Sequence, residues 1–221
     1  MGLIVFIGAF FYYPSKQIIL IGERHCDESC LQQELALWDR YYQRGFRHLF
    51  LETPFYTAQY LNLWMRSEND DFLNLLEADW EAHHVASQGP RILNFFKTIK
   101  TNYPETIFHG TDTGHQDGIG PRYLAYLEEN NLKDSEYYQK AQEIINQGNY
   151  IYRDDGFDWN TREFMMTLNF IREYEASGRP HLIGIYGYLH IGTEPSEITV
   201  PRMIQQLKAY YRIQTHDIRR L

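Results

Sequence analysis

Two segments far apart in the chain place a histidine three residues after a glycine. In the first, an apolar run ends at Gly22, and Glu23 and His25 follow; in the second, Gly187 precedes His190. A carboxylate beside an imidazole can set the histidine tautomer and raise its basicity, so that the ring accepts a proton from water. Imidazole and carboxylate are also ligands of zinc and manganese ions. These residue types therefore predict general-base or metal-assisted chemistry.

Two further apolar runs also end in polar residues. Glu52 follows the run 48–51, and three more candidates follow the run 106–108, namely His109, Asp112 and His115. In open α/β sheets, ligands bind outside the carboxyl ends of the strands. If each run is a strand, we expect these side chains to face one cleft.

The apolar runs are short and rich in β-branched residues, which is typical of buried parallel strands. Strands are expected at 17–22, 48–52, 106–110, 181–186 and 212–218. Apolar residues at three- and four-residue spacings predict helices between them, at 30–44, 58–65, 71–80, 91–101, 121–129, 135–147, 160–176 and 200–211. The fold class is therefore α/β, with a central, mainly parallel sheet flanked by helices. The unit 17–52 reads as strand, helix and strand, and should bring Glu52 beside Glu23 and His25.

Local signals predict how two of these helices begin and which side chains they bury. Asp27 or Ser29 should cap the helix 30–44, and Asn160 or Thr161 the helix 160–176. The buried face of the second helix is expected to consist of Phe164, Leu168, Ile171 and Tyr174. His48 and His181 lie at the opposite ends of their strands from the cleft, and a structural role is expected for both. His83 and His84 fall in an expected loop and should be solvated.

Composition narrows the classes of function and location. The net charge of −8 and the absence of a basic run argue against nucleic-acid binding, which needs clustered Lys and Arg. Residues 3–13 are apolar but shorter than the roughly 20 residues that a membrane span needs. We interpret residues 1–16 as an anchor remnant, which favours membrane association through 3–13 and a membrane-anchored or extracytoplasmic location. The alternatives are a helix or strand that packs on the domain, and a cytoplasmic location. Residues 17–221 should form a single α/β domain, in which Cys26 and Cys30 are ordinary thiols.

Four motifs occur in an order that resembles a known superfamily. They are Gly22-Glu23-Arg24-His25, Glu52 at the end of the next strand, Thr161-Arg162-Glu163-Phe164-Met165-Met166, and Gly187-Tyr188-Leu189-His190. Together they span about 17–192 and resemble the erythromycin esterases, ChaN-like haem-uptake lipoproteins and TIKI/TraB proteins. The resemblance implies an α/β sandwich with a polar cleft at the strand ends. It also implies one of three activities, namely metal-free hydrolysis by the first-motif His and Glu, metal-dependent proteolysis, or haem binding.

Our leading interpretation is a hydrolase that cleaves ester or peptide bonds in a small-molecule or peptide substrate. The expected catalytic residues are Glu23, His25, Glu52, Arg162 and His190. A divalent metal (manganese, zinc or iron) would be held by His25, His190, Glu23 and Glu52, and would lower the pKa of its bound water. Arg162 could pair bidentately with a carboxylate or a substrate anion, and Glu163 and Tyr188 are further cleft candidates. Three alternatives stay open: a metal-free mechanism with His25 as base oriented by Glu23, a haem or small-ligand carrier of the ChaN type, and a family member without catalytic activity.

Overall fold

The computed structural model describes residues 17–25, 27–82, 89–115, 118–154, 158–194 and 198–219. The expected anchor segment 1–16, Cys26, His83 and His84 lie outside these ranges. Cys30 is a buried free thiol. No helix within the described ranges is long and apolar enough to cross a membrane.

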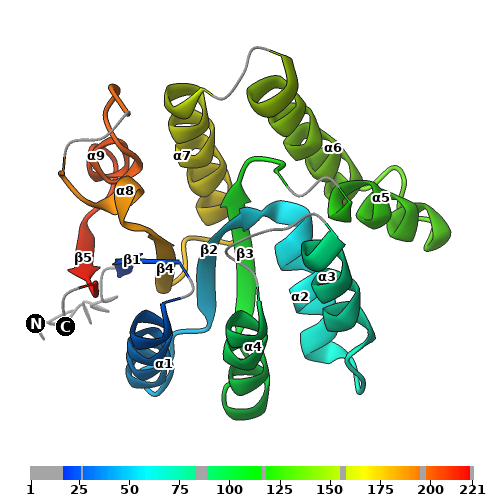
Figure 1. Ribbon diagram of the computed structural model, residues 1–221, viewed down its shortest axis with the longest axis horizontal. Helices are drawn as coiled ribbons and strands as arrows, with labels where there is room; N and C mark the ends of the chain where they lie inside the picture. The colour runs from blue at the N-terminus through cyan, green and yellow to red at the C-terminus, as the bar shows by residue number, and fades with distance from the viewer. Residues whose placement is uncertain are drawn as a thin grey trace, which may run out of the picture.

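A five-stranded parallel sheet forms the centre of the fold (Figure 1). Its strands are β1 (Ile18–Glu23), β2 (His48–Pro54), β3 (Ile107–Asp112), β4 (Leu182–Gly187) and β5 (Ile213–Asp217). Their order is β3-β2-β4-β1-β5, so that β4 lies between β1 and β2. All five expected strands are present, and the α/β class is confirmed. The order aligns the carboxyl ends of β3, β2, β4 and β1 along one edge.

Eight helices of the described ranges overlap the expected ones, although α9 is shorter than expected. The helices are α1 (Glu28–Tyr42), α2 (Phe55–Arg66), α3 (Asp71–Ala82), α4 (Pro90–Asn102), α5 (Ile119–Glu129), α6 (Glu136–Asn149), α7 (Trp159–Ala176), α8 (Tyr188–Ile191) and α9 (Met203–Lys208). The sequence patterns did not indicate the short α8 or the π-helical turn Tyr150–Asp154 that follows α6.

Each face of the sheet has its own apolar core because alternate side chains leave a strand on opposite sides. In β1, Ile19 and Ile21 join the core that contains α1 and α4. Ile18 and Leu20 join the core that contains α7 and α9. Figure 1 shows α1 and α4 on one side of the sheet and α7 and α9 on the other, with α2, α3, α5 and α6 gathered beyond β3. Side chains from the helices on both faces of the sheet can therefore reach the strand ends.

Helix α7 differs from its expected form in two respects. Its N-cap is Asp158, whose carboxylate accepts a hydrogen bond from the Asn160 backbone N–H, so the expected cap at Asn160 or Thr161 is wrong. Phe164 is 56% exposed, and the expectation that it belongs to the buried face is wrong. The apolar face instead centres on Met166 and Phe170. The actual start of the helix turns Arg162 and Glu163 inward.

The outer edge of β3 is closed by a side chain. Asn62 on α2 accepts a hydrogen bond from Phe108 N–H at 2.8 Å and donates one to the Phe108 carbonyl at 2.8 Å. The amide thus pairs with the strand as another strand would, which satisfies backbone groups that an edge strand leaves open. This pairing helps to hold β3, and with it Asp112, in place.

Candidate active site

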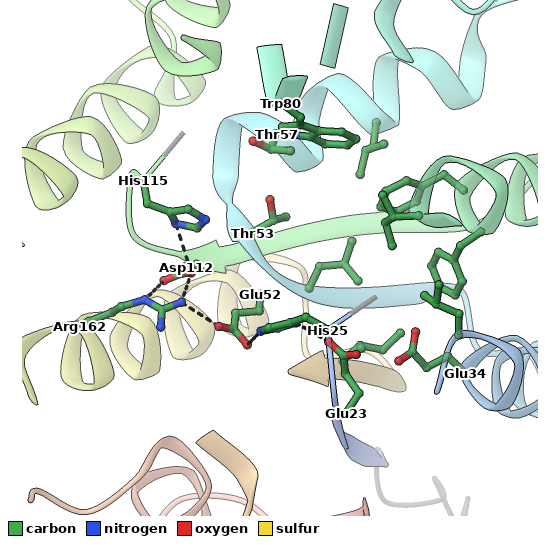
Figure 2. Close-up of a pocket in the computed structure, with 17 residues that line it drawn as sticks. Glu23, His25, Glu34, Glu52, Thr53, Thr57, Trp80, Asp112, His115 and Arg162 are labelled. Atoms are coloured by element: carbon green, nitrogen blue, oxygen red, sulfur yellow. Dashed lines mark hydrogen bonds and ion pairs between the residues drawn. The ribbon is translucent and has the colours of Figure 1, made fainter. Parts of the chain in front are cut away.

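The carboxyl ends of three strands bring charged side chains together around one cavity of about 240 Å³. Glu23 ends β1, Glu52 comes from β2, Asp112 ends β3, and His25 follows β1. Arg162 reaches the same place from the first turn of α7. Figure 2 shows Asp112, Arg162, Glu52, His25 and Glu23 as a connected row along the cavity. The expected convergence of Glu52 with Glu23 and His25 is therefore present, although β4 separates their strands.

Glu52 is the shared partner in this row. Its Oε1 lies 2.8 Å from Arg162 Nη2 and 3.2 Å from His190 Nε2. Its Oε2 accepts a hydrogen bond from Gly187 N–H at 2.6 Å and lies 3.7 Å from His25 Nε2. Burial by itself would raise the pKa of Glu52, but the charges of His190, His25 and Arg162 hold it well below its ordinary value. Glu52 is therefore an anion at neutral pH.

Arg162 joins two buried carboxylates. Its Nε donates to Asp112 Oδ1 at 3.1 Å, and its Nη2 donates to both Asp112 and Glu52. Such a fork-shaped pairing is what the planar guanidinium favours. Burial would lower the pKa of Arg162, but Asp112 and Glu52 raise it well above its ordinary value. Arg162 therefore holds the carboxylates of Asp112 and Glu52 in fixed positions.

His25 lies at the mouth of the cavity with 46% of its side chain exposed. Its Nδ1 is 2.5 Å from Glu23 Oε1, and the two side chains are joined by a hydrogen bond. The carboxylates of Glu52 and Glu23 raise the pKa of His25 to about 9, against the opposing effects of burial and His190. His25 is therefore mostly a cation at pH 7.

The glycine of the second motif makes room for this arrangement. A Cβ atom on Gly187 would lie 2.9 Å from His25 Nε2 and 3.2 Å from Glu52 Oε2. Both distances are shorter than normal contacts, so a larger residue would displace the histidine or the carboxylate. Because glycine has no side chain, the end of β4 can pass close to both His25, which follows β1, and Glu52 on β2.

His190 is buried behind Glu52 and does not line the cavity. Its Nδ1 is hydrogen bonded to Glu163, which also accepts the Met203 backbone N–H. Burial would lower the pKa of His190, but Glu52 and Glu163 raise it to about 10. His190 therefore serves as a positively charged support for Glu52, held in place by Glu163.

Two further candidates lie away from the cavity. His109 points to the α7 side of the sheet, where it bonds Glu173 and His48 at 2.8 Å each and stacks on Phe50. The expectation that His109 shares the cleft is wrong because its side chain leaves β3 on the other face. The Cζ atom of Arg219 lies 3.1 Å from the centroid of the Tyr188 ring, which it covers. Tyr188 is not among the residues that line the cavity.

Asp112 and His115 belong to the cavity wall, as expected. Asp112 is fully buried and accepts the Thr113 backbone N–H at 2.7 Å in addition to the Arg162 bonds. His115 Nδ1 lies 3.3 Å from Asp112 Oδ2. The motif around these residues was unassigned from sequence, yet it supplies the second carboxylate of Arg162.

The arrangement does not suit the expected metal ligands. His25, His190, Glu23 and Glu52 do not converge on one point, because the Arg162 guanidinium lies among them, with Nη1 3.3 Å from His190 Nε2. The Glu52 oxygens already accept N–H donors from Arg162 and Gly187. Within the described part of the chain, no group of three or more His, Cys, Asp or Glu residues is placed to hold a metal ion. The expected metal-ligand set is therefore unsupported.

Sequence reasoning missed the apolar part of the cavity and the carboxyl group within it. The cavity is also lined by Leu31 and Glu34 from α1, Trp80 from α3, and Phe95 and Phe96 from α4. A signal was available for Glu34, because it falls three residues after Leu31 and four before Trp38, on the buried stripe of α1. A charged residue on such a stripe indicates a special role or a buried partner.

Comparisons with known proteins identify the fold. No family model and no curated protein matches the chain. Among solved structures, a mutant of the erythromycin esterase EreC in its open conformation is similar, with a TM-score of 0.62 and 13% identity. The chain has the fold of an erythromycin esterase. The match covers 91% of this chain and 69% of that one.

Two other solved structures share the fold. A succinoglycan biosynthesis protein has a TM-score of 0.59 and 14% identity, with 90% of this chain covered. A protein from Bacillus cereus has a TM-score of 0.58 and 14% identity, with 92% of this chain covered. The chain spans 65% of the length of each of these two proteins. At these identities the likeness shows the fold, which is the one that the sequence motifs implied.

Proposed function

We propose that the protein is a metal-independent hydrolase of esters or amides, in which His25 activates a water molecule. The observation that carries the proposal is the position of His25: it is bonded to Glu23 on one ring nitrogen, and its other ring nitrogen faces Glu52 at the mouth of a cavity. Hydrolytic acyl transfer uses a base to activate water and a positive group to stabilise the developing negative charge. Here the base is His25, oriented by Glu23, and the positive group is the buried Arg162.

His25 and Glu52 together can place the attacking water. Their facing atoms, His25 Nε2 and Glu52 Oε2, are 3.7 Å apart. One water molecule beside this pair can reach both atoms at hydrogen-bond distance. Glu23 at Nδ1 favours the tautomer that leaves Nε2 free to accept the proton. Because the pKa of His25 is about 9, only about 1% of the side chain is in the base form at pH 7, and activity should rise up to about pH 9.

Arg162 is our candidate for stabilising the negative charge that develops on the carbonyl oxygen. Its side chain lines the cavity, and its Nε and Nη2 atoms are held by carboxylates. Its Nη1 lies 3.3 Å from His190 Nε2, which is protonated at neutral pH and cannot accept a bond. A positive charge held rigidly beside the cavity is suited to stabilise a developing oxyanion. The fold shared with an erythromycin esterase is consistent with such chemistry.

The proposal is tested with a panel of aryl esters and aryl amides, assayed with the purified protein in the presence and absence of a chelator. Hydrolysis that is unchanged by the chelator is the expected result. Activity that is lost with the chelator and restored by manganese, zinc or iron would contradict it in favour of a metallohydrolase. Binding without turnover, including a Soret band on titration with haem, would replace it with a ligand-binding role.

A further inference from the structure

Glu34 is a buried carboxyl group that the network around Arg162 does not use. It is 2% exposed, lines the cavity from α1, and its Oε1 has no hydrogen-bond partner among the residues that the structure describes. Figure 2 shows Glu34 at the end of the cavity away from Arg162, beyond Glu23. Buried polar groups are nearly always hydrogen bonded, so an exception that faces a cavity calls for a ligand.

Apolar side chains share the cavity with Glu34. Leu31 precedes it on the same helix, and Phe95, Phe96 and Trp80 also line the cavity. Burial, together with the nearby charge of Glu23, raises the pKa of Glu34 well above its ordinary value. Burial therefore favours the protonated form of the side chain, which can donate a hydrogen bond.

The size of the cavity indicates what fits beside Glu34. An apolar cavity of about 150 Å³ can hold a benzene molecule. At about 240 Å³, this cavity has room for a substituted ring with its reacting bond near His25. The aromatic side chains provide the flat, apolar contacts that such a ring favours.

We propose that the part of the cavity beside Glu34 binds an uncharged group of the substrate, of about the size of an aromatic ring, and that Glu34 donates a hydrogen bond to a carbonyl oxygen on that group. The inference rests on the proposed hydrolase function for its statement about substrates, but ligand binding tests it separately. Glu34 is a residue for specificity and takes no part in the activation of water.

A pair of probes isolates the hydrogen bond. 4-Acetylphenol and 4-ethylphenol have nearly the same shape, but only the first carries a carbonyl oxygen on its side group. Binding of each is measured by calorimetry with the wild-type protein, Glu34→Gln and Glu34→Leu. Glu28→Gln, an exposed glutamate on the same helix, is the matched control. Thermal unfolding of each variant without ligand verifies that it folds, and Glu34→Leu should have the higher Tm because an unsatisfied polar group is removed.

We expect the wild-type protein to prefer 4-acetylphenol by about tenfold, which corresponds to one hydrogen bond. Glu34→Gln should keep this preference within about threefold because its amide can still donate a hydrogen bond. Glu34→Leu should lose the preference and bind both probes similarly. An unchanged preference in Glu34→Leu, or no binding of either probe to the wild-type protein, would overturn the proposal.

The glutamine variant also separates a neutral ligand from a cation. If the subsite binds an ammonium group, which an ionised Glu34 would pair with, benzylamine should bind better than 4-acetylphenol. In that case Glu34→Gln should be as defective as Glu34→Leu, and this pattern would overturn the assignment of a neutral ligand. The same comparison with 4-acetylphenyl acetate and 4-ethylphenyl acetate as substrates extends the test to catalysis. Failure of the hydrolase proposal would appear as phenol binding without ester turnover, whereas failure of the Glu34 proposal would appear as turnover whose substrate preference ignores Glu34.

Discussion

Replacement of Arg162 by methionine should destabilise the protein strongly at neutral pH. The Arg162 side chain is 10% exposed and joins Asp112, which is fully buried, to Glu52. Removing one partner of a buried ion pair leaves an uncompensated charge and typically costs about 3–5 kcal/mol. In a chain of this size, 1 kcal/mol lowers Tm by roughly 2–4 °C. The expected decrease in Tm is therefore about 6–20 °C.

The matched control is on the same helix. Arg172 pairs with Glu143, and both side chains are about half exposed, at 51% and 50%. Arg172→Met should therefore change the free energy of unfolding by less than about 1 kcal/mol, because exposed ion pairs are screened by solvent. Urea denaturation followed by circular dichroism measures both variants. Equal stability of the two variants would refute the claim that the site is built around a buried cation.

Acidification gives the same prediction a second test. Burial would raise the pKa of Asp112 and Glu52, but in the wild-type protein Arg162 and nearby histidines hold both values below those of the unfolded chain. The carboxylates therefore stabilise the wild-type fold above about pH 4, and this contribution is lost as the pH falls through the folded-state values. In Arg162→Met, the two carboxyls should take up protons more readily, so the stability difference from wild type should shrink in acid. A difference that stays constant with pH would show that Arg162 acts through packing alone.

Three further predictions concern other parts of the site and the fold. In a nuclear magnetic resonance titration, His25 should have a pKa of about 9, and Glu52→Gln should lower it toward the ordinary value of 6.5; an unshifted wild-type value would contradict the close carboxylates. The raised pKa of His190 means that its contribution to stability is complete below pH 6.5 and is lost as the pH rises through about 10, so the urea midpoint should fall less steeply over that range in His190→Gln than in wild type. Equal slopes would argue that His190 is neutral when folded. Phe164→Ser should change the free energy of unfolding by less than about 0.5 kcal/mol, whereas Phe170→Ala, at a fully buried position, should cost about 3–5 kcal/mol; the reverse order in urea denaturation would contradict the observed face of α7.

Strands β1 to β4 could be predicted from sequence because each contains a short apolar run that is followed by polar residues, whereas β5 (Ile213–Asp217) is mostly polar. Their spatial order could not be predicted in the same way. β4 lies between β1 and β2, although about 130 residues separate β2 from β4 along the chain. The pairing depends on long-range packing of α7 and α9 against the sheet, which local patterns do not encode. The position of Gly187 was nevertheless informative, since only a glycine fits between His25 and Glu52.

The site was predicted in part. Glu23, His25 and Glu52 meet because each lies at or just after the carboxyl end of a parallel strand, and these ends share one edge of the sheet. His109 was misplaced because the argument used its position along the strand and not the face on which its side chain lies, where it bonds Glu173. A one-residue difference along a strand reverses that face.

The position of Arg162 explains why the metal-ligand prediction is unsupported, although most of the charged residues that line the cavity were predicted from the sequence. Histidines and carboxylates at a strand edge suggest a metal, and the sequence alone does not reveal that an arginine from α7 will lie among them. The guanidinium supplies a positive charge to Asp112 and Glu52, as a metal ion would. The Phe164 error has a related cause, because the helix begins at Trp159 under the Asp158 cap and its buried face is shared between apolar and charged residues.

The most direct test of the account is the effect of His25→Asn on ester hydrolysis in the presence of a chelator. The value of kcat/KM for 4-ethylphenyl acetate is measured for wild type, for His25→Asn and for His181→Gln, a control at the opposite end of the sheet, where His181 accepts the Gln17 backbone N–H. Loss of general-base catalysis should lower kcat/KM by at least about 100-fold in His25→Asn, with no change in His181→Gln. Full activity in His25→Asn would contradict the assignment of His25 as the base.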